Sequence, residues 1–389
     1  MRTALSSTLT LGRFSARAPP LRTEQQRSLD WLAEVHAESQ ATLDSSTRAQ
    51  RDAFAARLRR VIERCACGPA QIGSRGHVLA DFGRMDWDAL AIYDVTRHPR
   101  GKGTAARSRV FAEAVNAYFE AEYDDEPVAP GDLVHVTCTG YVSPSGAQRL
   151  VERKGWGRST RVTHAYHMGC YAAFPALRIA VGSLCAPERL ASSAVERRVD
   201  IVHTELCTLH LDPSNHSIEQ LVVQSLFADG FIRYSVREGG PGLRLLALDE
   251  RVLPESVDAM SWVLSDGGMQ MTLARDVPQR IAAMLRPFVT GLYEKAGLDA
   301  GARLAATVFA VHPGGPKIID GVRDVLELGE AQVKTSRQVL YDHGNMSSAT
   351  LPHVWMRLLA DEGTRPGTLV LSLAFGPGLT VCGALFEKQ

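Results

Sequence analysis

Three residues with chemically useful side chains stand where expected helices and strands begin or end: Cys170, His312 and Asn345. A cysteine can form a thioester, and a neutral histidine and an asparagine amide can each donate a hydrogen bond. Two neutral donors aimed at one oxygen make an oxyanion hole for an enolate, which a charged general base alone would not provide. The three residue types together therefore predict acyl-transfer chemistry through a cysteine.

Cys170 lies in the stretch HAYHMGCYAAFPALRIAVG (residues 164–182), where an extended segment gives way to a helical pattern. A cysteine at the start of a helix faces free backbone N–H groups and the positive end of the helix dipole. That setting favours the thiolate, which is the nucleophilic form. A single Gly-Cys pair in an apolar run is more often a buried core residue, so the interpretation depends on the two other residues.

His312 directly follows the apolar run 304–311, which predicts a strand, and precedes Pro-Gly-Gly-Pro. Asn345 follows Gly344 in DHGNMSSAT, where the glycine permits an unusual backbone and the asparagine would head a helix. Each residue also has a purely structural interpretation, as a hydrogen-bonded histidine and as an N-cap asparagine.

The order Cys–His–Asn also describes papain-like cysteine proteases. Those enzymes are disulfide-rich secreted chains with a C-G-S-C-W-like flank near the mature N-terminus. The flank here is MGCY at residues 168–171, so the sequence disfavours a protease.

Composition narrows the class of protein. The chain has 389 residues, 45% of them hydrophobic, and no net charge, which suits a globular protein of two fused halves rather than a partner of nucleic acid or an anionic membrane. Seven cysteines are scattered without zinc-ligand spacing. We therefore expect a reducing, cytoplasmic location and no metal. No apolar run approaches the roughly 18 residues of a membrane span.

Strand and helix patterns alternate along the chain, which predicts an α/β protein with parallel or mixed sheets covered by helices. We expect two halves, residues 1–235 and 236–389. The expected strands are 9–14, 133–139, 162–167, 199–203, 230–238, 243–248, 269–274, 304–311, 368–374 and 379–385. The expected helices are 24–41, 48–64, 107–123, 148–155, 218–227, 278–296, 318–326 and 345–359, besides the one that follows Cys170.

Four segments, GCYAAFPALRIA, HPGGPKIID, GNMSSAT and AFGPGLTV, occur in this order. They resemble the motifs of type III polyketide synthases, the chalcone-synthase-like ketosynthases of the thiolase fold. The resemblance runs from about residue 130 to the end. It implies a five-layered αβαβα fold, a homodimer, and neither a metal nor a bound organic cofactor. It also implies that Cys170 accepts the acyl chain, while His312 and Asn345 activate the extender or stabilise its enolate.

The resemblance further implies residues that bind the substrate. VVQSLFADG resembles the segment that carries a gatekeeper phenylalanine, here Phe227, and GYVSPSG resembles the loop that crosses the dimer interface. Trp262 stands where the family often has a cavity glycine, and Ala173-Phe174 replaces a usual Gly-Gly. The full set of expected substrate-binding residues is Phe227, Trp262, Met271, Leu209, Pro144 and Gly378.

The implied activity is Claisen condensation of acyl or β-ketoacyl thioesters of coenzyme A or an acyl carrier protein, giving an α-pyrone or related polyketide. An alternative is a ketosynthase that joins two carrier-bound β-ketoacyl chains into an α-pyrone antibiotic. Lower alternatives are an initiator resembling β-ketoacyl synthase III and an inactive scaffold. The arginines of residues 48–64 predict either a solvated helix face or a dock for the thioester carrier.

Overall fold

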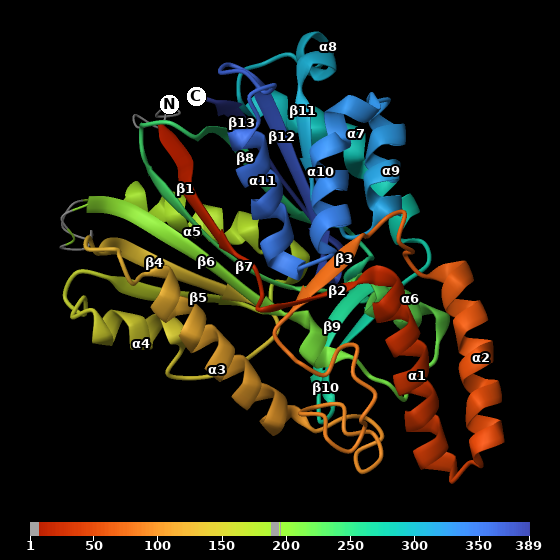
Figure 1. Cartoon of the computed structure of the whole chain (residues 1–389). Helices are drawn as coiled ribbons and strands as arrows, with labels where there is room; N and C mark the ends of the chain where they lie inside the picture. Colours follow the sequence, from red (N-terminus) through yellow and green to blue (C-terminus); the bar gives the residue numbers. More distant parts are fainter. Residues whose placement is uncertain (1–7, 188–193, 195) are drawn as a thin grey trace.

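A mixed sheet runs through the molecule (Figure 1). The computed structural model describes residues 8–187, 194 and 196–389. Within these residues, the strands of the sheet are, in spatial order, β11 (Val308–Val311), β12 (Leu369–Gly376), β13 (Thr380–Lys388), β8 (Leu243–Val252), β1 (Leu9–Arg17), β7 (Asp229–Glu238), β6 (Glu196–Leu206), β4 (Pro130–Thr137) and β5 (Arg161–Tyr166). Strand β1 joins the two halves, because it pairs along β7 but meets β8 only at Thr10–Arg244 and Leu11–Leu243.

Helices cover the sheet on both faces in each half. Helices α3 (Thr104–Glu122) and α4 (Gly146–Arg153) lie outside the N-terminal half. Helices α5 (Ala173–Leu184) and α11 (Thr350–Ala360) lie between the two halves. Helices α7 (Val277–Lys295) and α9 (Pro316–Leu326) lie outside the C-terminal half. The rings of Phe174 in α5 and Trp355 in α11 meet edge to face at 5.9 Å. The expected αβαβα layering is confirmed.

Strand β12 has an apolar sequence throughout because it is covered by a hydrophobic core on each face. Leu371, Leu373 and Phe375 belong to the core under α7 and α9. Val370 and Ala374, which point the other way, belong to the central core with α5 and α11. Successive side chains of a strand point to opposite faces, so a strand covered on both faces needs a continuous apolar run.

The expected strand 304–311 is only partly correct. Residues Ala300–Arg303 form the short helix α8, and Leu304–Ala306 continue it as a 3-10 turn. Asp299 caps α8 by accepting a hydrogen bond from the backbone N–H of Gly301 at 2.9 Å. The cap starts a helical turn, and the alanine-rich residues that continue it have the apolar pattern expected of a strand. Only Val308–Val311 therefore pair in the sheet.

Helix α10 (Glu330–His343) was not predicted. It lies along β11, the last strand of the sheet. The hydroxyl of Ser336 accepts a hydrogen bond from the backbone N–H of Val311 at 3.0 Å. The helix therefore protects an edge strand that would otherwise expose unpaired backbone groups.

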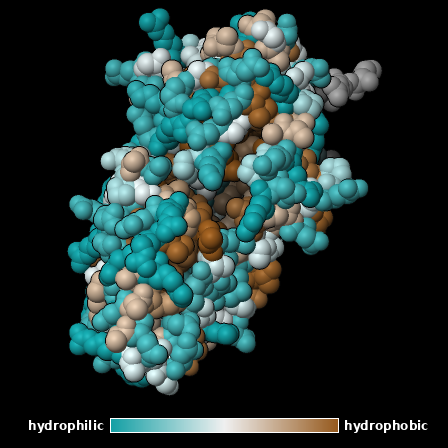
Figure 2. Space-filling model, turned by 90° about the vertical axis from the view of Figure 1, so that its right-hand side faces the viewer, coloured by the Kyte–Doolittle hydropathy of each residue, from teal (hydrophilic) through white to brown (hydrophobic). Residues whose placement is uncertain are grey.

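Further elements lie together at the lower right of Figure 1: helices α1 (Gln25–Asp44), α2 (Arg48–Cys65) and α6 (Ile218–Leu226), the β2–β3 pair (Leu21–Glu24, Ser74–His77) and the β9–β10 hairpin (Met260–Ser265, Gly268–Leu273). Figure 2 shows the face on the right of Figure 1, which is hollowed at mid-height and exposes hydrophobic side chains in the hollow. None of the described helices combines the length and apolarity needed to cross a membrane.

The expected border between residues 235 and 236 falls inside β7. A strand that pairs with β1 and β6 along its length belongs to one half. We therefore keep the division into two halves as a proposal and place its border at residues 239–242, between β7 and β8.

Candidate active site

Cys170 stands on a sharp turn between β5 and α5. It lies in a 3-10 turn, Gly169–Tyr171, immediately before the helix. Gly169 has a φ of +72°, and a Cβ there would lie 2.6 Å from Cδ of Pro377. Only glycine fits this conformation and this close approach, so the Met-Gly-Cys sequence is what aims Cys170 toward β12.

The expected preference for the thiolate is wrong for this site as it stands. Cys170 is only 9% exposed. Burial raises the pKa of its thiol to about 12, while hydrogen bonds from Ser347 and Asn345 act in the opposite direction and are smaller. The loss of hydration therefore raises the pKa of the thiol by more than the helix N-terminus lowers it. The thiol thus needs a base when it reacts.

Asn345 presents its amide nitrogen to the site. Its side-chain oxygen accepts hydrogen bonds from the backbone N–H of Ser347 at 2.9 Å and from the Thr350 hydroxyl at 3.4 Å. The oxygen is therefore occupied, and the NH₂ group is left to donate. It contacts the carbonyl of Gly314 at 3.4 Å and lies within hydrogen-bond reach of Cys170. Asn345 thus precedes α11 by a 3-10 turn, Ser347–Ala349, rather than opening the helix directly.

His312 follows β11, as expected, and its ring is buried. Its backbone N–H donates to the carbonyl of Leu373 at 2.8 Å. Both ring nitrogens are buried without a hydrogen-bond partner among the described residues, which costs on the order of 1–3 kcal/mol for each unsatisfied group. Burial lowers the pKa of His312 to about 3, so the ring is neutral. An unpaired polar group in a tightly packed loop is typical of a functional site.

The loops that carry His312 and Asn345 touch each other. A Cβ on Gly314 would lie 3.5 Å from Cδ2 of His312, and the carbonyl of Gly314 accepts from the Asn345 amide. Asn345 in turn reaches Cys170. The fold therefore brings the three predicted residues to one region, although no hydrogen bond joins His312 to Cys170.

A cavity of about 20 Å³ opens beside Cys170. It is lined by Cys138, Gly169, Cys170, Cys207, Phe227, Trp262, Met271, Ser347 and Pro377. That is room for about one water molecule, well below the volume of pockets that enclose a small molecule. Three of the expected substrate-binding residues, Phe227, Trp262 and Met271, lie in this wall.

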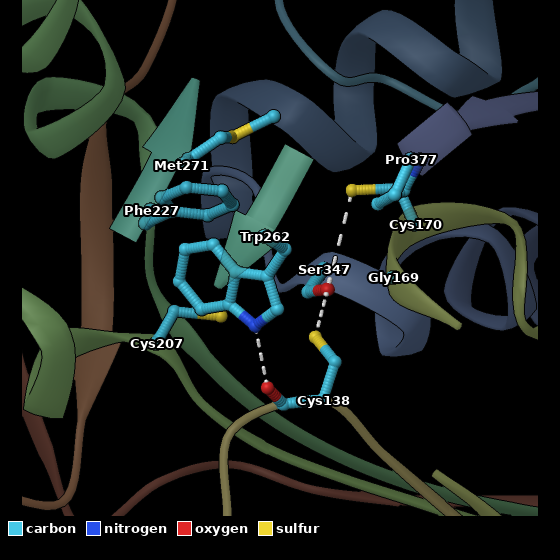
Figure 3. Close-up of a pocket in the computed structure, with 9 residues that line it drawn as sticks. All are labelled: Cys138, Gly169, Cys170, Cys207, Phe227, Trp262, Met271, Ser347 and Pro377. Carbon is cyan, nitrogen blue, oxygen red and sulfur yellow. Dashed lines mark hydrogen bonds between the residues drawn. The ribbon is translucent and has the colours of Figure 1, made fainter. Parts of the chain in front are cut away.

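Trp262 divides the cavity. It lies directly opposite Met271 in the β9–β10 hairpin, and its indole N–H donates to the carbonyl of Cys138 at 2.7 Å. Its ring lies 6.1 Å from that of Phe227. Figure 3 shows the indole between Phe227 and Met271 on one side and the Ser347 and Cys138 side chains on the other.

The other three expected substrate-binding residues are not part of this wall. Leu209 is fully buried in the core under α3, where its side chain cannot reach the cavity. Pro144 lies on an exposed loop. Gly378 has a φ of +70° and supports the turn after Pro377, which does line the cavity. Phe174, which stands in place of a usual glycine, packs on Trp355 between the halves.

Sequence reasoning missed the side chains that contact the cysteine. Ser347 accepts or donates a hydrogen bond to Cys138 at 3.0 Å and lies 4.0 Å from the Cys170 sulfur. It stands two residues after Asn345 in the same motif, which was the available signal. Cys138 and Glu205 gave no local signal, because each sits in an ordinary apolar strand segment.

The chemistry available is a thiol in the wall of a small apolar cavity, with a neutral imidazole and an oriented amide on the neighbouring loops. In the described part of the chain, no group of three His, Cys, Asp or Glu side chains is arranged as metal ligands would be. The arrangement therefore suits acyl transfer to sulfur and stabilisation of an enolate.

Comparisons with known proteins place this site in a family. Residues 244–388 match the family described as chalcone and stilbene synthases, C-terminal domain. Over 297 residues the chain is 28% identical to a 1,3,6,8-tetrahydroxynaphthalene synthase of Streptomyces coelicolor, covering 74% of this chain and 76% of that protein. Over 265 residues it is 30% identical to type III polyketide synthase C of Arabidopsis thaliana, covering 66% of this chain and 67% of that protein.

The fold of the chain also matches the solved structure of one of these relatives. The crystal structure of the Streptomyces coelicolor 1,3,6,8-tetrahydroxynaphthalene synthase superposes with a TM-score of 0.76 at 26% identity, covering 98% of this chain and 99% of that one. Fold and site thus define a ketosynthase, an enzyme that forms carbon–carbon bonds on a thiolase-like fold. The chain belongs to the type III polyketide synthases.

Proposed function

We propose that the protein is an acyltransferase in which Cys170 carries the growing acyl chain and His312 and Asn345 hold the enolate of the extender. The observation that carries the proposal is the fixed orientation of the Asn345 amide. Its oxygen is occupied by Ser347 N–H, so its NH₂ must donate, and the neutral His312 ring has both nitrogens unpaired nearby. Two neutral donors suit an oxyanion better than they suit a cation or a metal.

The reaction proceeds in two stages. The Cys170 sulfur attacks the carbonyl carbon of an acyl thioester, and the carrier thiol leaves with the proton that Cys170 gives up. A second thioester then loses CO₂ or a proton to form an enolate, whose oxygen accepts hydrogen bonds from His312 and Asn345. The enolate carbon attacks the acyl carbonyl, the bond to Cys170 breaks, and the sulfur is released for another cycle.

The small cavity supports few condensations. A free volume of about 20 Å³, with the Trp262 indole in its wall, leaves little space for a long iterative chain. We therefore favour a short product such as an α-pyrone. The same restriction supports the second candidate, a single condensation that joins two preformed β-ketoacyl chains.

The thioester carrier is coenzyme A or an acyl carrier protein. A groove lined by Arg59, Arg64 and Gln71, among others, lies between α1 and α2. Arg51 and Arg59 are already paired with Glu34, so Arg64, which lines the groove, is the better candidate to meet the phosphates of either carrier.

We further propose a homodimer in the cytoplasm. Tyr141 and Pro144 lie exposed on the loop that leaves the cavity wall at Cys138, where a second copy could complete the site. All seven cysteines are free, as a reducing compartment would leave them.

Turnover with malonyl-CoA compared with turnover of carrier-bound β-ketoacyl chains tests the proposal. Product formation with either donor, lost in Cys170→Ala, supports a condensing enzyme. Efficient repeated use of malonyl-CoA would rule out the chain-joining candidate, and the absence of condensation with both donors would overturn the proposed function.

A further inference from the structure

Arg75 in β3 is a buried cation whose hydrogen bonds go only to backbone carbonyls. It is 1% exposed. Its Nη1 donates to the carbonyls of Gln224 and Phe227, each at 2.8 Å. Its Nε and Nη2 are buried without a hydrogen-bond partner among the described residues. Burial lowers the pKa of the guanidinium to about 10, so Arg75 still carries its charge at neutral pH.

This arrangement is costly for a residue that serves stability alone. Each unsatisfied buried group costs on the order of 1–3 kcal/mol, and a buried charge without a hydrogen-bonded partner of opposite sign adds to that cost. The charge of Asp229 acts on Arg75, but the Asp229 oxygens accept from Thr208 and Val78 instead. A cost of this size at one position is typical of a functional site.

The two carbonyls that Arg75 binds lie at the end of α6. Gln224 is in the last turn of the helix, and Phe227 is the residue that follows it. The last carbonyls of a helix have no partner within it and carry the negative end of the helix dipole. Arg75 therefore caps α6 with a charge of the favourable sign. It also fixes the backbone of Phe227, whose side chain lines the cavity (Figure 3).

Asn345 is joined to the same segment by two backbone hydrogen bonds. Its N–H donates to the carbonyl of Leu226, and its carbonyl accepts from the N–H of Ala228, both at 2.9 Å. These bonds lie on either side of Phe227, which forms a β-bridge with Asn345. Arg75 thus holds the residue at the centre of the junction that carries Asn345.

Arg75 also touches the turn that precedes Asn345. A Cβ on Gly344 would lie 3.1 Å from Cγ of Arg75 and 2.9 Å from the carbonyl oxygen of Leu226. Gly344 has a φ of +73°, a conformation that favours glycine. The aliphatic part of Arg75 therefore packs against one segment of the junction, while its guanidinium binds the other.

The strand that carries Arg75 is anchored to the end of α10. Strand β3 pairs with β2 and contacts α10 (Figure 1). The backbone N–H of Gly73 donates to the carbonyl of Tyr341 at 2.7 Å, and the Arg22 guanidinium donates to the carbonyl of Asp342 at 2.7 Å. The β2–β3 pair is therefore fixed to the segment that leads into Asn345.

We propose that Arg75 is a positioning residue for condensation, which fixes the junction between Phe227 and Asn345 and so sets the direction of the Asn345 amide. Arg75 does not line the cavity and acts through Asn345. The inference rests on the proposed role of Asn345 as a donor to the enolate. It predicts that loss of the guanidinium impairs condensation and spares acyl transfer to Cys170, which a general loss of stability would not do.

Hydrogen exchange measures the junction without any substrate. In Arg75→Met the side chain keeps a similar volume but makes neither contact with a carbonyl. We expect the amides of Asn345 and Ala228 to exchange at least about tenfold faster, because the junction that protects them opens more often. Mass spectrometry of the peptides that contain these two residues gives the rates. Unchanged exchange in both peptides would overturn the inference.

The rates of the two chemical steps show whether the junction serves condensation. In Arg75→Met we expect condensation to fall about 10–10²-fold, since small displacements of reacting groups are costly. Acyl transfer to Cys170 should stay within a few fold. Quenched-flow product analysis and intact-protein mass spectrometry measure the two steps. Equal losses in both steps would show a structural role only and would also overturn the inference.

Arg75→Lys carries the test if circular dichroism shows that Arg75→Met does not fold. The lysine side chain is one bond shorter, so its ammonium keeps the charge but cannot reach both carbonyls from the position of Nη1. We expect the ratio of condensation to acyl transfer to fall about three- to tenfold. An unchanged ratio in folded Arg75→Lys would overturn the inference.

Arg198→Lys is the matched control. Arg198 is equally buried, at 1% exposed, and lies near the start of β6, where it pairs with Glu126 and Asp200. The same change of side chain there should leave both the exchange of the Asn345 peptide and the ratio of the two steps unchanged. An effect as large as that of Arg75→Lys would assign the loss to stability and overturn the inference.

The two measurements separate this inference from the proposed function. Faster exchange in the Arg75 variants, together with no condensation by the wild-type protein, would reject the proposed function and leave Arg75 as the residue that holds the junction. Condensation by the wild-type protein, together with unchanged exchange and unchanged rates in Arg75→Met, would keep the proposed function and reject the role of Arg75.

Discussion

The side-chain oxygen of Asn345 accepts a hydrogen bond from the backbone N–H of Ser347 at 2.9 Å. This one contact decides which end of the amide the substrate meets. It also ties the enolate-binding residue to the serine that touches the nucleophile, since both stand in one tight turn before α11. Acylation and condensation are thus served by neighbouring groups with separable roles.

Replacing Asn345 by aspartate should separate those roles. Asp keeps an oxygen for Ser347 N–H but offers no N–H donor to an enolate. We expect condensation to fall about 10²–10³-fold, the cost of one oxyanion-hole donor, while acyl transfer to Cys170 stays within a few fold. Quenched-flow product analysis and intact-protein mass spectrometry measure the two steps. Equal loss in both would contradict the assigned role.

Gly169→Ala should slow acyl transfer to Cys170. Its Cβ would lie 2.6 Å from Cδ of Pro377, and its φ is +72°, so the turn and the sulfur must move. We expect at least about a tenfold slower acylation, since small displacements of reacting groups are costly. Gly155→Ala is the control, because Gly155 has a φ of +67° but open space around it. Similar acylation rates in the two variants would argue against the close approach.

Trp262→Gly should lengthen the product or admit longer acyl chains. The change removes the indole that divides the cavity and its hydrogen bond to Cys138. Trp262→Phe, which keeps most of the volume, should keep the original product. Liquid chromatography with mass spectrometry reads the chain length, and an unchanged product distribution in the glycine variant would show that Trp262 does not limit the chain.

Acid should destabilise the protein. Burial lowers the pKa of His135, His203, His210 and His312 to about 3 in the folded state, against 6.5 when unfolded. Between these values the unfolded chain binds more protons, so stability falls as pH falls below 6.5, by up to about 1.4 kcal/mol per pH unit for each ring. Asp229, whose pKa burial raises to about 6, opposes this, as does Glu205, whose pKa burial also raises.

Calorimetric melting temperatures at pH 7.5, 6.5 and 5.5 measure the acid effect. We expect a decrease at each step, and a shallower decrease in His135→Gln, which removes one of the buried rings. A melting temperature that stays constant or rises on acidification would contradict the assignment of these histidines as buried and neutral.

The sequence predicted most of the layers because their patterns are strong. Continuous apolar runs such as β12, and the helix behind Cys170, leave few alternatives. Helix α10 was missed because only one side of it meets the sheet, at the edge strand β11, so its apolar signal is weak. The run 304–311 was misread because the Asp299 cap, a single side-chain contact, converts its first residues into a helical turn.

The residues of the site likewise include some that the sequence pointed to and some that it did not. Cys170, His312 and Asn345 were predictable because each has a glycine-rich or proline-rich flank at the end of an element. Ser347 and Glu205 were not, because their contacts with Cys170 and Cys138 depend on how the 3-10 turn Ser347–Ala349 packs against β6, which no local pattern encodes. Leu209 was misplaced for a related reason, since a fully buried core leucine and a pocket leucine look alike in sequence.

The most direct test of the account is a single-turnover experiment with an acyl-CoA, followed by intact-protein mass spectrometry and peptide mapping. We predict that the protein gains the mass of one acyl group, located on Cys170, and loses it as a condensed product when an extender thioester is added. Cys170→Ala should gain no acyl mass. An acyl group found on another residue, or retained covalently by Cys170→Ala, would contradict the assignment of Cys170 as the carrier of the chain.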